Sequence, residues 1–188
     1  MQYIVIDLEW NQSLDGKPDK TGLTFEIIEI GALKLNERWE VTGEFQEVVQ
    51  PQLYPRMNEI IGGMVPISQE ELDGARTFPE VMGDFLEWCG SEPVFCTWGS
   101  MDLWELQKNM DYYGVKNPFP RPLYYYDIQK LYSLCFDDGK SRISLETAVE
   151  RLSLKKKEAF HRAKQDCAYT AQVLSKLDWQ RMRRMISV

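Results

Sequence analysis

The sequence predicts an α/β fold in which a mixed sheet of five strands is flanked by helices. Three apolar, strand-like segments follow one another early in the chain with short connections, which indicates antiparallel strands. Strand and helix patterns alternate in the remainder, as they do where parallel strands are covered by helices. The 188 residues, 44% of them hydrophobic, suffice for one full core. A single domain over residues 1–188 is therefore expected.

The first strand is predicted at residues 3–10, where an apolar run rich in β-branched residues ends in Asp7 and Glu9. Because side chains alternate along a strand, the two carboxylates share a face. Like charges on a core strand repel each other and resist desolvation, and a divalent cation would resolve this conflict. The alternative is that the strand runs out into solvent at Asp7.

The elements that follow are read from turn residues and hydrophobic periodicity. After a turn-rich loop, two more strands are predicted at residues 25–35 and 44–50. Short apolar segments predict the last two strands at 94–96 and 123–126. Helical periodicity predicts helices over residues 78–89, 101–112, 128–136, 144–152 and 163–177. Active sites on such sheets gather at strand ends.

Asp102 opens the helix predicted over residues 101–112. An acid in a first turn can simply complement the helix dipole, which contributes ~0.3–1 kcal/mol. However, Asp102 shares a side of this helix with Leu106 and Met110, so it heads the stripe that packs inward. This placement favours a functional role.

His161 is the only histidine, and it precedes the helix predicted over residues 163–177. In that helix Asp166 lies on the same stripe as Cys167 and Thr170, among core-facing positions. A lone histidine is more often a surface or capping residue than a catalyst. Beside a metal site, however, a neutral imidazole is suited to accept a proton near neutral pH.

Composition limits the function classes and the compartment. The net charge of −7 argues against a broad basic face that grips nucleic acid, although it does not exclude a nuclease whose acids bind cations. The four cysteines form no close pair, which is typical of reduced thiols in a cytoplasmic protein. No membrane association is expected, because the chain has no basic-then-apolar leader and no apolar stretch of about 20 residues.

The ordered set Asp7, Glu9, Asp102, His161 and Asp166 resembles the DEDDh group of 3′-to-5′ exonucleases, which have the RNase H-like fold. Residues 26–32 look like that family's second strand, and residues 77–81 like one of its helix starts. The resemblance covers residues 3–177. Segments 45–51 and 98–132 look most like the exoribonuclease branch that trims small or structured RNAs in eukaryotes, and like its bacterial relatives.

The resemblance implies a role for each residue of this set. Asp7 would bridge two metal ions, Glu9 and Asp166 would complete the site of one, and Asp102 would hold the other. His161 would be the general base. Magnesium or manganese is expected, because both ions suit oxygen ligands that leave several waters in place.

The implied reaction is hydrolysis from the 3′ end of single-stranded nucleic acid, with RNA favoured over DNA, releasing nucleoside 5′-monophosphates. No protein partner is indicated. The candidate substrate-binding residues are Leu8, Trp10, Phe25 and Met101, since bases stack on aromatic and apolar side chains. Two alternatives remain open: a DNA-directed exonuclease of the proofreading or repair type, and a non-catalytic nucleic-acid-binding module on the same fold.

Overall fold

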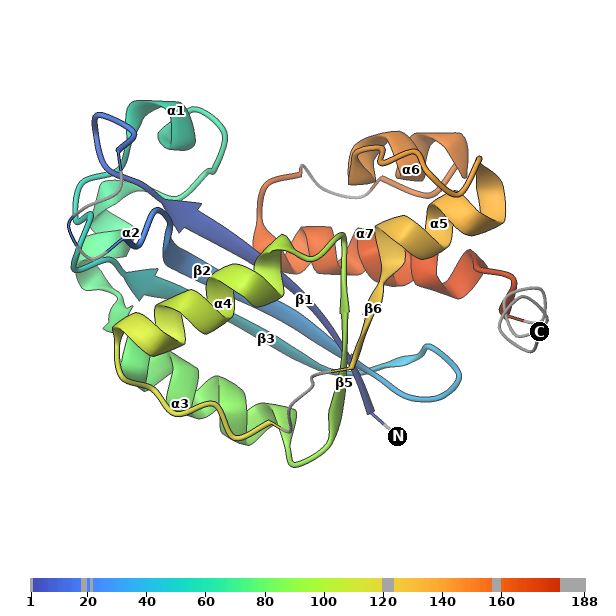
Figure 1. The fold of residues 1–188 in the computed structure, drawn as a ribbon, viewed down its shortest axis with the longest axis horizontal. Helices are drawn as coiled ribbons and strands as arrows, with labels where there is room; N and C mark the ends of the chain where they lie inside the picture. Colours follow the sequence, from blue (N-terminus) through green and yellow to red (C-terminus); the bar gives the residue numbers. More distant parts are fainter. Residues whose placement is uncertain (1, 18–19, 21, 120–123, 157–159, 180–188) are drawn as a thin grey trace.

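A six-stranded mixed sheet forms the centre of the computed structural model, which describes residues 2–17, 20, 22–119, 124–156 and 160–179 (Figure 1). The strand order is β4-β3-β2-β1-β5-β6. The strands are β1 (Gln2–Asn11), β2 (Glu26–Leu35), β3 (Val41–Gln50), β4 (Arg76–Thr77), β5 (Pro93–Thr97) and β6 (Tyr125–Asp127). Strands β1, β2 and β3 are antiparallel to one another, whereas β5 pairs parallel with β1 and with β6.

The predicted mixed sheet is confirmed, but the prediction of five strands was wrong by one. The additional strand is β4, which pairs parallel with the end of β3. A strand of two residues is too short to show an alternating pattern in the sequence. The fifth predicted strand, 123–126, corresponds to β6, and residue 123 lies outside the described residues.

Helices cover both faces of the sheet (Figure 1). They are α1 (Glu59–Gly62), α2 (Gln69–Gly74), α3 (Phe78–Cys89), α4 (Met101–Tyr112), α5 (Ile128–Phe136), α6 (Leu145–Arg151) and α7 (Ala163–Lys176). Helices α3 and α4 pack on one face, and α5, α6 and α7 share a core cluster on the other. The five predicted helices are confirmed, whereas the short helices α1 and α2 were not predicted.

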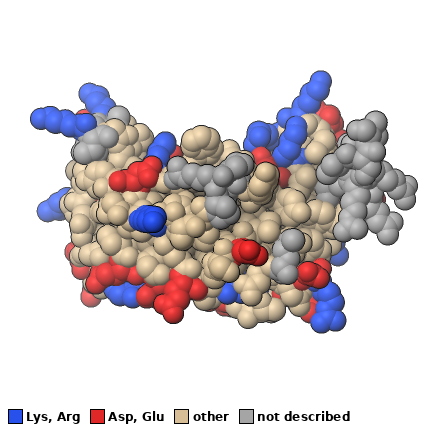
Figure 2. Space-filling view, turned by 60° about the horizontal axis from the view of Figure 1, so that its bottom comes forward, with Lys and Arg blue, Asp and Glu red and all other residues tan. Residues whose placement is uncertain are grey.

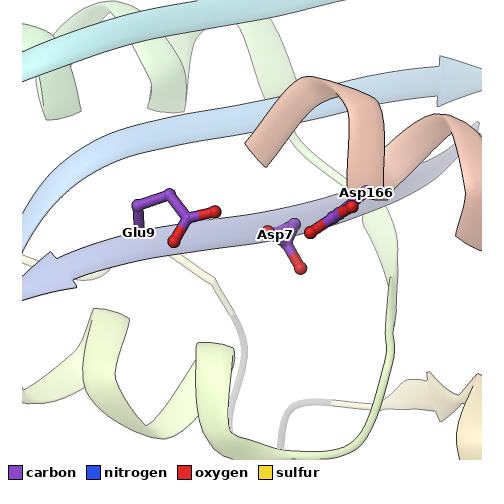
Figure 3. Close-up of side chains that lie close together, drawn as sticks. All are labelled: Asp7, Glu9 and Asp166. Carbon is purple, nitrogen blue, oxygen red and sulfur yellow. The ribbon is translucent and has the colours of Figure 1, made fainter. Parts of the chain in front are cut away.

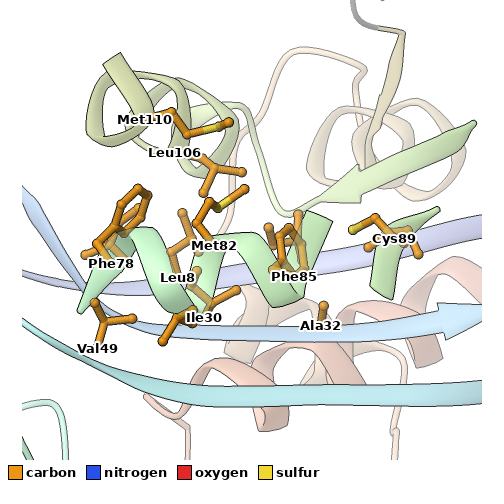
Figure 4. Close-up of a cluster of buried hydrophobic side chains, with 14 of the residues drawn as sticks. Leu8, Ile30, Ala32, Val49, Phe78, Met82, Phe85, Cys89, Leu106 and Met110 are labelled. Carbon is orange, nitrogen blue, oxygen red and sulfur yellow. The ribbon is translucent and has the colours of Figure 1, made fainter. Parts of the chain in front are cut away.

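The alternation of side chains along β1 divides the core in two. Ile4, Ile6 and Leu8 pack toward α3 and α4, in the cluster that Figure 4 shows. Val5 points to the opposite face and packs with residues of α5, α6 and α7. Because every second residue shares a face, Asp7 and Glu9 continue the face of Val5 and point toward α7.

Strand β1 loses its neighbour on one side before it reaches the acidic residues. It pairs with β5 only from Gln2 to Val5, whereas its pairing with β2 continues to Asn11. Asn11 is fully buried. The alternative in which the strand runs out into solvent at Asp7 is therefore wrong, and the edge of β1 beyond Val5 is open toward the start of α4.

The cysteines are free, as predicted. Cys89, Cys96 and Cys167 are buried, and Cys135 is half-buried. Burial raises the pKa of the Cys96 thiol to about 12, so this side chain is an inert core residue at neutral pH. Within the part of the chain that the structure describes, no helix combines the length and the apolar character that crossing a membrane requires.

Candidate active site

Three carboxylates converge between β1 and the first turn of α7 (Figure 3). Asp7 and Glu9 come from β1 and Asp166 from α7, and one oxygen of each lies within 4.8 Å of the others. Asp166 Oδ1 is buried and has no hydrogen-bond partner among the described residues. An unpartnered buried oxygen beside two further carboxylates is a donor set that suits a divalent cation with oxygen ligands.

The three carboxylates have raised pKa values. Burial, and then repulsion from Asp102, Asp166 and Glu9, raises the pKa of Asp7 well above its usual range. Burial, followed by repulsion from Asp166, raises the pKa of Glu9 to about 8, and burial raises that of Asp166 to about 6. At neutral pH the cluster therefore resists full ionisation, and a cation would remove that resistance.

Asp102 joins this site from α4, through the open edge of β1. Its Oδ1 accepts the backbone N–H of Leu8 at 3.2 Å, and the side chain is only 6% exposed. Burial raises the pKa of Asp102 to about 7, and its charge in turn raises that of Asp7. Asp102 stands beside the three-carboxylate group, not within it. Its inward direction agrees with the prediction, and its bond to β1 goes beyond a helix-dipole contact.

A glycine lets α7 approach the sheet closely enough for Asp166 to reach β1. Gly31 lies opposite Asp7 in the β1–β2 register. A Cβ atom at Gly31 would overlap the backbone of Ala163 and Lys164 at the start of α7. Cys167 Sγ also donates a hydrogen bond to Gly31 O at 3.2 Å. The helix thus rests directly on the β2 backbone.

His161 lies at the exposed rim of the site, just before α7. Its backbone N–H donates a hydrogen bond to Asp166 Oδ2 at 3.2 Å, and its φ angle is 69°. This left-handed conformation is uncommon for a residue with a side chain. This backbone hydrogen bond lowers the pKa of Asp166, against the larger effect of burial. The structure therefore places His161 next to Asp166, and its role as the base stays a prediction.

Glu29 and Arg162 complete the surroundings of the site, and neither was predicted as a site residue. Glu29 lies opposite Glu9 in the β1–β2 register and is fully buried. A side-chain oxygen of Glu29 lies 2.7 Å from Arg162 Nη2. The sequence does carry a signal, because a carboxylate inside the apolar run of a central strand must be paired.

The four predicted substrate-binding residues differ in their surroundings. The Leu8 side chain lies in the core, 4% exposed, so only its backbone could meet a substrate. Trp10 and Phe25 are half-buried, with ring centroids 5.5 Å apart. Met101 is 51% exposed at the start of α4, beside Asp102. Contacts of these four residues with a substrate stay predictions.

The surface in Figure 2 carries scattered charges, with acidic side chains gathered along its lower edge. On this face the Lys and Arg side chains of the described residues do not form a continuous band.

The family model RNase_T, described as exonuclease, matches residues 4–174. The chain is 28% identical over 189 residues to a PolC-type DNA polymerase III of Clostridium perfringens, covering 100% of this chain and 12% of that protein. It is 26% identical over 140 residues to the 3′-5′ exoribonuclease 1 of Mus musculus, covering 69% and 40%. The chain thus spans less than half the length of these relatives.

Solved structures share the fold. The nuclease domain of 3′hExo, a DEDDh family member bound to rAMP, has a TM-score of 0.79 at 24% identity, covering 93% of this chain and 90% of that chain. S. pombe Pop2p, solved in a form with Mg²⁺ and Mn²⁺ bound, has a TM-score of 0.65 at 17% identity, covering 93% and 81%. Together with the family match, these likenesses confirm the predicted RNase H-like fold and the DEDDh resemblance.

Proposed function

The chain belongs to the RNase_T family of exonucleases, and from this premise we propose that it is a metal-dependent 3′-to-5′ exonuclease acting on single-stranded nucleic acid, RNA in preference to DNA. The products would be nucleoside 5′-monophosphates. The observation that carries the proposal is the convergence of Asp7, Glu9 and Asp166 within 4.8 Å, with one buried oxygen of Asp166 unpartnered among the described residues.

The proposed cofactor is magnesium or manganese, two ions per site. Asp7, Glu9 and Asp166 would hold one ion, and Asp7 together with Asp102 the other. All of these ligands are oxygens, which such hard cations prefer. When bound, two divalent ions stabilise negative charge on the attacking and leaving oxygens of a phosphodiester.

The protein's own side chains would position the terminal nucleotide and accept the proton of the attacking water. The imidazole of His161, exposed beside Asp166, would take the proton of the attacking water as general base. The Leu8–Asp102 hydrogen bond fixes the start of α4 against β1. The adjacent, tilted rings of Trp10 and Phe25 would lie alongside the terminal nucleotide, and Met101 would contact it from α4.

RNA is the proposed substrate because one set of relatives, including that of Mus musculus, bears the name 3′-5′ exoribonuclease 1. A DNA substrate is the second candidate, because the PolC-type DNA polymerase III of Clostridium perfringens matches across the whole of this chain. Both candidates use the same chemistry. We also propose that residues 1–188 act as one domain, since all of the described strands belong to a single sheet.

The test is digestion of 5′-labelled single-stranded RNA and DNA of equal sequence, with magnesium, manganese or chelator. We expect a metal-dependent ladder that shortens from the 3′ end, faster on RNA, and absent for His161→Ala and Asp7→Asn proteins. A faster ladder on DNA would select the second candidate. Intact strands under all conditions, with retained strand binding, would favour a non-catalytic binding module.

A further inference from the structure

We propose that Glu29 and Arg162 are the positioning residues of the site: the pair fixes the segment that carries His161 and Asp166 against β2. This proposal rests on the proposed function, because it assigns a role within that same site. Neither residue belongs to the carboxylate group that would hold metal. Their effect on catalysis would therefore act through His161 and Asp166.

Donors from three residues converge on the buried carboxylate of Glu29. Arg162 donates from Nε at 3.0 Å and from Nη2 at 2.7 Å, both to Oε1. The backbone N–H of Ala163 donates to Oε2 at 2.9 Å, and Gln46 Nε2 donates to Oε1 at 2.8 Å. Glu29 is 0% exposed, so its carboxylate depends on these donors instead of on water, and charge-assisted hydrogen bonds of this kind are stronger than neutral ones.

These contacts hold the start of α7. Arg162 is the N-cap residue of α7, and its own side chain makes no capping bond. Glu29, from β2, instead accepts the first helical N–H, that of Ala163. His161 directly precedes this junction and bonds Asp166 through its backbone. A shift of the junction would therefore displace both residues from Asp7 and Glu9.

Stability alone does not explain the pair. A buried ion pair is weak evidence for stability, because desolvation offsets the attraction between the charges. Here the cost is higher, since the Glu29 charge also repels Glu9, whereas Arg162 opposes that repulsion. Two neutral, well-packed residues would avoid both the desolvation cost and the repulsion of Glu9. They would not provide the directional hydrogen bonds that a planar guanidinium donates to a carboxylate.

Arg76 offers a matched control for Arg162 on the same surface. A shallow, open surface depression is lined by Gln46, Arg76 and Arg162, among others. Arg76 is paired with Asp84 at 2.7 Å and with Glu47 at 3.6 Å, at the exposed edge of the sheet. Arg76→Met removes the same charge as Arg162→Met, but leaves the start of α7 untouched.

The experiment compares Arg162→Met, Arg162→Lys and Arg76→Met in the full chain, after circular dichroism has verified folding. Two quantities are measured: kcat and KM on the preferred strand, and the rise in Tm on adding MnCl₂. Arg162→Met should lower kcat about 10–100-fold, the usual effect of losing a partner that orients a metal ligand, with KM within about twofold. It should also shrink the manganese-induced Tm rise. Arg162→Lys should fall between wild type and Arg162→Met, and Arg76→Met should match wild type.

Equal kcat values and equal manganese shifts for Arg162→Met and Arg76→Met would overturn the proposal. The proposal would also be overturned if Arg162→Met lowered the Tm in chelator but changed neither kcat nor the manganese-induced rise in Tm, because the pair would then contribute to stability alone. If Arg162→Met does not fold, the same comparison is made with Arg162→Lys. If wild type cleaves neither RNA nor DNA, the proposed function fails, and the manganese shift still decides whether the pair positions the carboxylates.

Discussion

At the level of single residues, the buried carboxylates of the site are the feature that favours cation binding. Asp7, Glu9 and Asp166 lie together on the inner side of β1 and α7, where burial opposes their charges. Such a cluster is costly without a counter-ion, so its residues should be suboptimal for stability and necessary for activity. This trade-off is directly measurable.

The first prediction concerns Asp7→Asn. Without metal, the substitution should raise stability by about 1 kcal/mol, or roughly 2–4 °C in Tm, because it removes a carboxyl group whose ionised form is opposed by burial and by neighbouring carboxylates. Activity should fall about 10³-fold, since metal sites supply several kcal/mol of transition-state stabilisation. Differential scanning calorimetry in chelator, with the exposed acid variant Asp111→Asn as control, checks the first part. A lower Tm than wild type would contradict it.

The second prediction concerns pH. The folded-state pKa of Glu9 is about 8 and that of Asp166 about 6, against ordinary values of 4.5 and 3.8. Because the pKa values of both carboxyls are higher in the folded protein than in the unfolded chain, their protonation stabilises the fold. This contribution to the free energy of unfolding is complete below the ordinary pKa values and is lost as pH rises through 6 and 8. The Tm of metal-free protein should therefore fall between pH 5 and pH 8, and manganese should reduce the fall. A metal-free Tm that climbs across this interval would refute this reading of the cluster.

At the scale of elements, the site depends on how closely α7 and α4 approach β1. Because Gly31 has no side chain, α7 can pack directly against the β2 backbone. Because the β1–β5 pairing ends at Val5, Asp102 from α4 can bond to the β1 backbone at Leu8. The β1–β2 register shifts between Glu9 and Trp10, so a bulge lies at the edge of the site, where bulges commonly redirect side chains.

The third prediction is that Gly31→Ala displaces α7. The added methyl would overlap the backbone of Ala163, so unfolding should become easier by about 1–3 kcal/mol. Metal-dependent cleavage should weaken as Asp166 moves away from Asp7. The matched control is Gly83→Ala, because Gly83 lies within α3 and a Cβ there meets nothing within 4 Å. If Gly31→Ala behaves like this control in Tm and in rate, the close approach is not required.

Elements were predictable from the sequence where local signals are long and agree with one another. Helix α3 matches its predicted bounds because Thr77 and Glu80 form a capping box and Pro79 lies in the first turn. Helices α1 and α2 span only four and six residues, too short for periodicity to show. Glu29 could be seen as an acid in an apolar strand, but its partner Arg162 lies 133 positions away and only the fold reveals it.

At the scale of the whole molecule, a net charge of −7 limits how nucleic acid can be held. The acids of the site would be neutralised by cations, and few phosphates are expected to contact lysine or arginine. Affinity would then come from stacking and from the metal site rather than from a basic groove.

The fourth prediction is a weak dependence of binding on salt. With about three or fewer phosphate contacts on a single strand, the slope of log K against log salt should be no steeper than about −2. Fluorescence anisotropy of a labelled strand with Asp7→Asn protein, from low to moderate salt, measures this slope without cleavage. A slope near −5 would reveal a basic surface that the composition does not predict.

Asp7, Glu9 and Asp166, with Asp102 beside them, should form a divalent-cation site. Calorimetric titration of manganese into metal-free wild-type and Asp7→Asn protein, above neutral pH, measures this binding. We expect saturable binding of two ions in wild type and the loss of at least one of them in Asp7→Asn. Identical isotherms for the two proteins would show that these carboxylates do not form a cation site.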